Sequence, residues 1–292
     1  MSIYDELKMK VFYSGNRVNL LIGINVIVFL LVTLISVFSY LFVKPNFIDP
    51  LVRSYFGVPT YLPQLLYRFW TPFTYIFFHD GLFHILFNML WLYWMGRIFE
   101  EFLNGKKLTF VFLAGGIAGA LFYILCYNLI PVFAGNVLSS TLIGASASVT
   151  AIVIATATLL PDYTISLLLI GPVRLKWIAI FYVIFDFISL TGPNAGGHLS
   201  HLGGAIFGFF FIKSLQKGND WSKPFENLFK PKSKLKVVSK NQNVNTSRAK
   251  QDLPNQEEID RILDKISQTG YHKLTKKEKE LLFNASKSDE KR

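Results

Sequence analysis

Runs of apolar residues, separated by short polar segments, fill the first three quarters of the chain. A helix needs about 20 largely apolar residues to cross the hydrocarbon core of a bilayer, and we interpret six runs as spans. They cover residues 18–43, 82–99, 108–129, 142–160, 177–190 and 199–215. The second, fifth and sixth runs are short or carry polar residues. The pattern predicts an all-α membrane protein in which six transmembrane helices form a bundle.

Beyond the last run the pattern changes twice. Residues 217–251 are rich in Lys, Asn and Ser and lack periodicity, which is typical of a flexible linker. Residues 252–292 regain a helical period, and Thr275 and Glu278 have capping-box spacing. The sequence therefore predicts four parts: an N-terminal segment (1–17), a membrane domain (18–216), a basic linker (217–251) and a small helical hairpin tail (252–292).

The composition agrees with a membrane protein. Hydrophobic residues make up 51% of the chain and charged residues 17%, which is less charge than soluble domains carry. Cys126 is the single cysteine and lies inside the third run, so an intrachain disulfide or a cysteine metal cluster is excluded. No cofactor is expected.

The net charge of +11 is concentrated after the last run, where seven lysines lie between Lys217 and Lys240. Such a cluster is typical of the cytoplasmic side and of contact with anionic lipid. A stop-transfer flank without any ligand is an equal interpretation. Nucleic-acid binding is not expected, because no nucleic-acid-binding motif accompanies the lysines.

Loop charges predict the orientation. The loops PVFAGNVLSS and TGPNAGG carry no Lys or Arg, whereas the loops on the other side contain several. The long first loop, with Lys44, Arg53 and Arg68, is the one conflict. The bias places both termini in the cytoplasm, and we expect a multi-pass protein of the bacterial inner membrane.

In that orientation the second, fourth and sixth spans all run from outside to inside. Their first turns contain His84 and Asn88, then Ser146, then His198 and His201. Three distant segments thus bring polar groups to a similar depth. Polar groups inside a membrane are costly and indicate a functional site.

Two stripes of small residues predict that the fourth and sixth spans pack closely. One stripe is Ser200, Gly204 and Gly208, and the other is Ala147, Ala151 and Ala155. Each lies one position from a reactive side chain, so Ser146 and His201 can meet. A serine beside a base is the basic unit of nucleophilic catalysis. For a lone serine, helix packing would be the simpler interpretation.

The motifs GASAS, SHLGGAIFG and HILFN, in a chain with six apolar runs, resemble the rhomboid family of intramembrane serine proteases. The likeness runs from about Arg68 to Gly208. It implies a serine endopeptidase that cleaves peptide bonds in or near transmembrane segments of membrane proteins with a Ser-His dyad. The first loop and the fifth span are then the candidates for the substrate gate.

The resemblance also implies roles for individual residues. Ser146 of the G-x-S motif, which begins at Gly144, matches the nucleophile. His201, in a setting with Gly204 and Gly208, matches the base. His84 and Asn88 match the groups that stabilise the oxyanion, and Arg68 in YRFWTP matches the arginine of a first-loop motif.

The chain departs from the family at Tyr67, which replaces the tryptophan of the first-loop motif, and at two positions near the expected nucleophile. Ala147 replaces a common glycine after the nucleophile, and Thr150 replaces a tyrosine that stacks on the histidine. Another side chain must then orient His201, and His198 is one candidate. Asp186 is a second, although it could instead bond loop amides or a helix terminus.

Three other interpretations remain from the sequence. A non-proteolytic rhomboid-like protein would bind client transmembrane helices, but both reactive residues are present. A small transporter would show internal repeats, and none is found. A zinc site formed by His79, His84, His198 and His201 has spacings that are not diagnostic, so no metal is expected.

Overall fold

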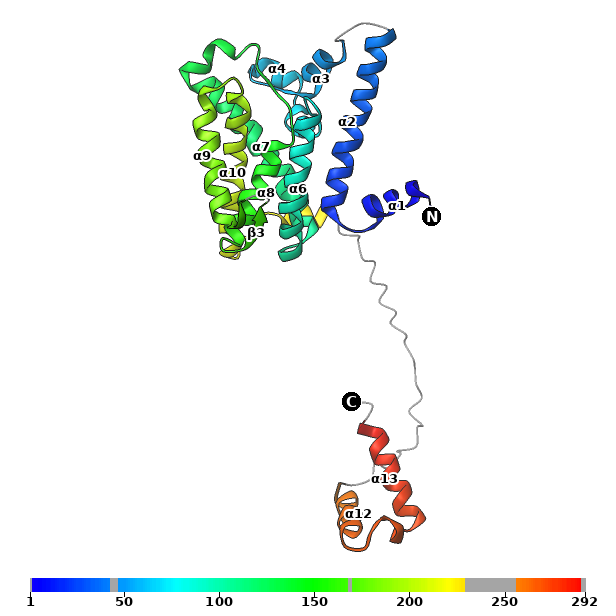
Figure 1. Ribbon diagram of the computed structural model, residues 1–292. Helices are drawn as coiled ribbons and strands as arrows, with labels where there is room; N and C mark the ends of the chain where they lie inside the picture. Colours follow the sequence, from blue (N-terminus) through cyan, green and yellow to red (C-terminus); the bar gives the residue numbers. More distant parts are fainter. Residues whose placement is uncertain (1, 43–46, 168–169, 229–255, 290–292) are drawn as a thin grey trace, which may run out of the picture. The chain divides into compact units, whose positions relative to one another are not determined.

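The computed structural model describes residues 2–42, 47–167, 170–228 and 256–289. Its contacts divide the chain into two units, Met1–Pro231 and Lys232–Arg292. The membrane unit, Met1–Pro231, contains all the residues of the candidate site. It is mostly helical (Figure 1).

Four helices of the described residues are long and apolar enough to cross a membrane. They are α2 (Arg17–Phe42), α6 (Leu82–Phe102), α7 (Gly105–Leu129) and α10 (Ala195–Gln216). The fourth and fifth predicted spans correspond to α8 (Ser146–Leu159) and α9 (Leu175–Ile188), which have only 14 residues each. The structure therefore gives a multi-pass helical membrane protein.

Short elements connect these helices. Before α2 lie α1 (Ile3–Lys8) and a π-helix (Met9–Tyr13). The first loop contains α3 (Ile48–Phe56), β1 (Val58–Pro59), α4 (Leu62–Tyr67), α5 (Thr71–Thr74) and η2 (Tyr75–Phe77). Two 3₁₀ turns, η3 (Pro131–Asn136) and η4 (Ser189–Thr191), follow α7 and α9.

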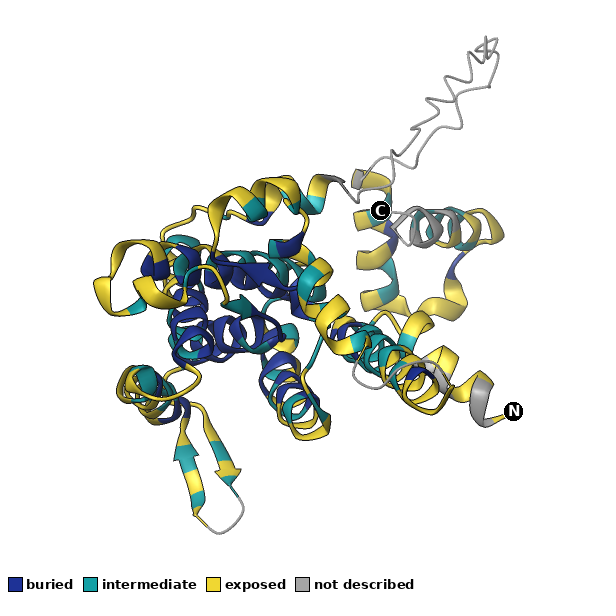
Figure 2. Ribbon diagram, turned by 90° about the horizontal axis from the view of Figure 1, so that it is seen from above, coloured by how far each residue is buried: buried dark blue, intermediate teal, exposed yellow. Residues whose placement is uncertain are grey.

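Helix α8 lies at the centre of the membrane unit, in contact with α6, α7, α9 and α10. Buried residues gather in the middle of this unit when it is viewed from above (Figure 2). Ala147, Ala151 and Ala155 of α8 are all fully buried. Because an alanine side chain is only a methyl group, neighbouring backbones can approach α8 closely.

The two predicted stripes meet as expected. A Cβ atom added to Gly204 would overlap the carbonyl oxygen of Ala147, and one added to Gly208 would overlap that of Ala151. Helices α8 and α10 therefore touch backbone to backbone. The predicted close packing of these two segments is confirmed.

The fourth predicted span begins four residues late, because residues 142–145 are not helical. β2 (Thr141–Leu142) pairs antiparallel with β1 of the first loop. Gly144 follows with φ +127°, a conformation that side-chain-bearing residues rarely adopt. This extended segment makes Ser146 the first residue of α8.

The apolar stretch before the fifth span contains two paired strands, which the hydropathy pattern did not predict. β3 (Thr164–Leu167) pairs antiparallel with β4 (Gly171–Arg174). Asp162 at its base pairs with Lys176 at 2.7 Å, and these two groups are outside the helical core. The Lys176 ammonium beside it lowers the pKa of Asp162.

The predicted linker does not begin at residue 217. Instead, α11 (Lys223–Leu228) continues the membrane unit. Lys107 at the start of α7 pairs with Asp220 at 2.8 Å and with Glu226 at 2.9 Å. This ion-pair network holds the segment against the bundle, so residues 217–228 are a structured part of it. The remainder of the predicted linker, 229–251, lies outside the described residues.

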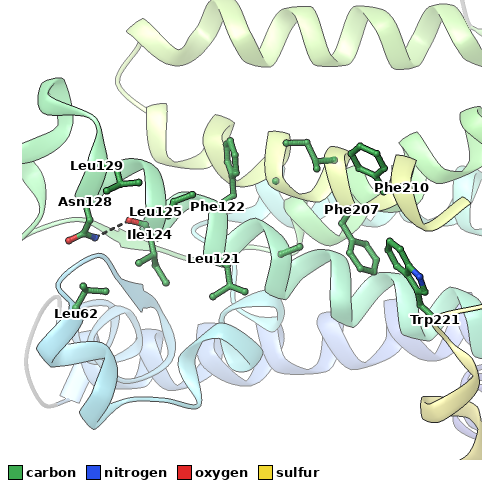
Figure 3. Close-up of a pocket in the computed structure, with 13 residues that line it drawn as sticks. Leu62, Leu121, Phe122, Ile124, Leu125, Asn128, Leu129, Phe207, Phe210 and Trp221 are labelled. Carbon is green, nitrogen blue, oxygen red and sulfur yellow. Dashed lines mark hydrogen bonds between the residues drawn. The ribbon is translucent and has the colours of Figure 1, made fainter. Parts of the chain in front are cut away.

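An apolar pocket of about 810 Å³ lies along α7 and α10 (Figure 3). Leu121, Phe122 and Leu125 of α7 and Phe207 of α10 line it, with Trp221 at one end. Asn128 is a polar residue in this otherwise mostly apolar lining, and its side chain donates to the carbonyl of Ile124 at 2.9 Å. None of the predicted site residues lines this pocket.

The second unit, Lys232–Arg292, contains α12 (Gln256–Thr269), a 3₁₀ turn (Tyr271–Lys273) and α13 (Lys276–Asp289). Gly270 ends α12 with φ +80°. Thr275 and Glu278 make the reciprocal hydrogen bonds of a capping box. Among the described residues of this unit, Ile262 of α12 and Leu274, just before α13, are buried apolar residues.

Candidate active site

A polar pocket of about 740 Å³ lies among α6, α8, α9 and α10. Four predicted site residues line it: Ser146 of α8, His84 and Asn88 of α6, and His201 of α10. These residues come from three helices that are far apart in sequence. The structure thus brings together the hydroxyl, the imidazoles and the carboxamide that the sequence placed at one depth.

Ser146 occupies the N-terminus of α8. The first intrahelical hydrogen bond runs from the Val149 N–H to the Ala145 carbonyl, so the N–H groups of the first turn have no intrahelical acceptor. The partial positive charge of a helix N-terminus favours an anion at this point. A negative oxygen formed beside Ser146 would therefore meet a favourable field.

Gly144 brings His84 close to Ser146. A Cβ atom at Gly144 would lie 2.7 Å from His84 Cε1, 2.8 Å from His84 Nε2 and 3.7 Å from Ser146 Oγ. The histidine ring occupies space that only a glycine leaves free. The Gly144 N–H donates to the Tyr75 carbonyl at 3.0 Å, which holds this turn in place.

His84 is oriented as a donor toward the pocket. Its Nδ1 accepts a hydrogen bond of 3.4 Å from the backbone N–H of Asp80. In a neutral imidazole one nitrogen accepts and the other carries the proton, so Nε2 carries it here. This Nε2–H faces the turn at Gly144.

Asn88 is 7% exposed and follows His84 by one helical turn. Its Nδ2 donates to the His84 carbonyl at 2.7 Å. A carboxamide nitrogen has two N–H groups, and one of them is sufficient for this contact. The second is available to a group in the pocket.

His201 contacts a carboxylate. Its Nδ1 lies 2.8 Å from Oδ1 of Asp186 in α9, and the Nδ1 of His198 lies 2.7 Å from the same oxygen. Asp186 is 2% exposed. The alternative in which Asp186 bonds loop amides or a helix terminus is thus wrong.

Tyr182 of α9, which no sequence motif indicated, also lines the pocket. Its ring centroid lies 6.2 Å from that of His201 and 6.2 Å from that of Trp91 in α6. It places an aromatic ring beside the histidine from a different helix than the family's tyrosine would. Thr150, at the family's tyrosine position, donates instead to the Ser146 carbonyl at 2.8 Å.

The Ala147 departure does not crowd the pocket. Its methyl group is fully buried and faces Gly119 of α7, where an added Cβ would lie 2.5 Å from it. Arg68 does not line the pocket. It donates to the Ser54 carbonyl and stacks over Tyr55, with its guanidinium 5.2 Å from the ring centroid. It holds parts of the first loop together.

His79 supports His84 from the first loop. The two rings meet edge to face with centroids 5.1 Å apart. Burial, followed by the neighbouring His84, lowers the pKa of His79 to about 3. Its ring is therefore neutral in the folded protein at physiological pH.

The four-histidine zinc site is not assembled. Among the described residues, the His, Cys, Asp and Glu side chains close enough to share one ion are Asp186, His198 and His201. His79 and His84 are not part of this group. Asp186 already bonds both imidazoles of the group.

The sequence of the chain matches two protein-family models. A family model described as Rhomboid domain matches residues 67–217. A second, described as a family of unknown function (DUF6576), matches residues 239–288.

Two relatives illustrate the similarity. The chain is 28% identical over 160 residues to RHOMBOID-like protein 12, mitochondrial, of Arabidopsis thaliana, a match that covers 52% of this chain and 48% of that protein. It is 43% identical over 49 residues to Rhomboid protease GlpG of Salmonella newport (strain SL254), covering 17% of this chain and 18% of that protein. The chain thus spans less than half the length of these curated relatives. The family match extends over more than half of the chain, from the first loop through α10, and the chain belongs to the rhomboid family.

Proposed function

We propose that this chain is an intramembrane serine endopeptidase that hydrolyses peptide bonds in or near transmembrane segments of membrane proteins. The observation that carries the proposal is the shared pocket, in which Ser146, His201, His84 and Asn88 all take part. A serine, a base and hydrogen-bond donors around one cavity are the minimum required for acyl transfer.

In the proposed mechanism His201 takes the hydroxyl proton of Ser146 as its Oγ attacks the substrate carbonyl. The oxyanion of the tetrahedral intermediate accepts hydrogen bonds from the Ser146 N–H, the Asn88 carboxamide and His84 Nε2–H. The protonated His201 then gives its proton to the leaving amine, and the C–N bond breaks. Water hydrolyses the acyl-enzyme by the same steps, with His201 again as base.

The contact between α6 and α9 supports a lateral entrance for the substrate. Trp91 and Tyr182 meet there edge to face, and both line the pocket. Separation of these two rings would open the pocket toward the lipid. We therefore retain α9, together with the first loop, as the proposed gate.

The arrangement in the membrane is also a proposal. We infer six membrane segments, with the short α8 and α9 as the fourth and fifth, and both termini in the cytoplasm on the basis of loop charge. A bacterial inner membrane remains our proposal for the location, although one relative is named mitochondrial. The proposed anionic-lipid segment, Lys217–Lys240, includes described residues only as far as 228.

The test is cleavage of a single-span model substrate by purified protein in detergent. The wild type and Ser148→Ala should release a fragment, because Ser148 is fully buried on the side of α8 that faces Gly116. Ser146→Ala and His201→Ala should release none. Cleavage by Ser146→Ala at the wild-type rate would refute a serine-protease mechanism. Failure of every folded form to cleave would favour the non-proteolytic alternative, a protein that binds client helices.

A further inference from the structure

Helix α9 buries its one carboxylate while it exposes most of its apolar surface. Its buried residues are Leu175, Ile178 and Asp186, whereas neighbours such as Phe185 and Phe187 are exposed. A carboxylate inside a membrane segment is costly unless it is bonded to a partner. The reason for retaining Asp186 must therefore lie in what it contacts.

Asp186 contacts two imidazoles with one oxygen. Its Oδ1 lies 2.7 Å from His198 Nδ1 and 2.8 Å from His201 Nδ1. The two histidines are three residues apart on α10 and so project from the same face. Their ring centroids are 5.7 Å apart. The other carboxylate oxygen, Oδ2, is buried and has no hydrogen-bond partner in the described part of the chain.

These contacts determine which nitrogen of His201 carries the proton. An ionised carboxylate can only accept hydrogen bonds, so both Nδ1 atoms must donate. In the neutral ring of His201 the Nε2 lone pair is then free. That lone pair is the one available to a serine proton, because Nδ1 is already directed at Asp186.

We propose that Asp186 is a positioning residue that fixes the tautomer and orientation of His201 and stabilises the imidazolium formed during catalysis. This inference rests on the proposed function. It adds a third member to what the family resemblance implies is a Ser-His dyad, in a chain where Thr150 stands at the family's tyrosine position. His198, the second donor to the same oxygen, keeps the carboxylate in place.

Asp186→Asn is the sharpest variant, because it keeps the size and one acceptor oxygen but removes the charge. We expect kcat to fall by up to about 10⁴-fold, the loss that follows when a triad carboxylate becomes an amide, with KM nearly unchanged. Asp186→Leu, which also removes the acceptor, should lose at least as much. Asp186→Glu should recover part of the loss. Asp162→Asn is the matched control: this carboxylate belongs to the hairpin before α9, and its loss should leave kcat unchanged.

A spectroscopic measurement separates positioning from general damage to the fold. In ¹⁵N-histidine NMR spectra of the full chain in detergent, the His201 signals are assigned by their loss in His201→Gln. The wild type should show the tautomer protonated at Nδ1. Asp186→Leu should shift the population toward protonation at Nε2. If Asp186→Leu does not fold, the kcat of Asp186→Asn and the His201 tautomer in the wild-type spectrum still test the positioning role.

The outcomes are distinct. Asp186→Asn with wild-type kcat, or a wild-type His201 protonated at Nε2, overturns the positioning role while Ser146→Ala remains inactive. Cleavage by Ser146→Ala overturns the proposed function itself.

One oxygen of Asp186 and one ring nitrogen each of His198 and His201 lie within 4.8 Å of one another, so the cleavage assay is also run with a chelator. Loss of activity in EDTA with recovery in Zn²⁺ would make Asp186 a metal ligand and overturn the proposal.

Discussion

At the scale of single residues, the proposed chemistry depends on where each donor and acceptor points. Ser146 begins a helix whose first N–H groups are free of intrahelical bonds. His84 presents its Nε2–H because its Nδ1 accepts from Asp80. These orientations arise from backbone contacts, so they are fixed before any substrate enters. Preorganised donors of this kind are the main source of electrostatic catalysis.

Asn88→Ala tests the oxyanion proposal. Removal of one such donor typically lowers kcat by about 10²–10³-fold, and KM should change little because the bond forms mainly in the transition state. Asn128→Ala is the matched control. The Asn128 carboxamide donates to the carbonyls of Thr60 and Ile124, and Asn128 does not line the polar pocket that contains Ser146. Steady-state kinetics at equal folded fraction provide the measurement. An Asn88→Ala enzyme with wild-type kcat would remove Asn88 from the mechanism.

Because of His79, we expect the free energy of unfolding to decrease in acid. The folded-state pKa of His79, about 3, lies below the ordinary value of about 6.5, so protons bind the unfolded chain preferentially. The contribution of His79 to the free energy of unfolding is therefore complete above pH 6.5. As the pH falls from 6.5 to 3, this contribution decreases by about 1.4 kcal/mol per pH unit. Thermal unfolding in detergent between pH 7.5 and 5 should show this slope.

His79→Phe keeps a ring beside His84 but cannot titrate, so its melting temperature should depend less on pH in this range. His272→Phe, at an exposed position in the second unit, should retain the wild-type dependence. An unchanged slope in His79→Phe would assign the acid sensitivity to other groups.

The sequence was sufficient to find four of the residues that line the pocket, but not their interactions. Ser146, His84, Asn88 and His201 were found from motifs and membrane depth, which depend on short-range spacing. The contacts of Asp186 and Tyr182 with His201 depend on the rotation of α9 relative to α10. That rotation is set by tertiary packing, and no local pattern encodes it.

At the scale of elements, α8 is the centre around which the site is built. It has 14 residues because it begins only at Ser146, after the non-helical residues 142–145. Its small side chains let α7 and α10 approach, which brings His201 of α10 and Ser146 of α8 to the same pocket. Helix packing and the site are therefore linked through the glycines of α10.

Gly204→Ala should weaken the protein and its activity together. The added Cβ would overlap the Ala147 carbonyl oxygen, and backbone atoms cannot rotate away. Overpacking of this kind costs about 1–3 kcal/mol, so the melting temperature should fall. Cleavage should fall as well, because His201 moves with α10. Gly135→Ala, where a Cβ meets nothing within 4 Å, should match the wild type. Wild-type stability of Gly204→Ala would contradict the close contact.

Hydropathy located the helices better than their ends. Helix α10 begins at Ala195, one turn before the predicted span. Gly196 and Gly197, which the loop sequence TGPNAGG had placed outside the helix, are buried helical residues. The hydropathy pattern placed residues 142–145 in a span, but the pairing of Leu142 with β1 and the positive φ of Gly144 keep these residues out of the helix. The hairpin of β3 and β4 also escaped detection, since an apolar run alone does not distinguish strand from helix.

At the scale of the whole molecule, the proposed site needs only the first unit. All residues of the pocket lie within Met1–Pro231. A chain truncated after residue 231 should therefore cleave a model substrate at nearly the full rate in detergent. A chain truncated after residue 216 should be less stable, because it loses Asp220 and Glu226, the partners of Lys107. An inactive but folded 1–231 chain would show that the second unit takes part in catalysis.

The central claim is that Ser146 is a nucleophile activated by His201. The most direct measurement is covalent labelling of the purified full chain with a fluorophosphonate, followed by mass spectrometry of the modified peptide. The account predicts one adduct, on Ser146, that forms equally in Ser148→Ala, is lost in Ser146→Ala and is strongly slowed in His201→Ala. An adduct that persists in Ser146→Ala, or a labelling rate in folded His201→Ala equal to that of the wild type, would contradict it.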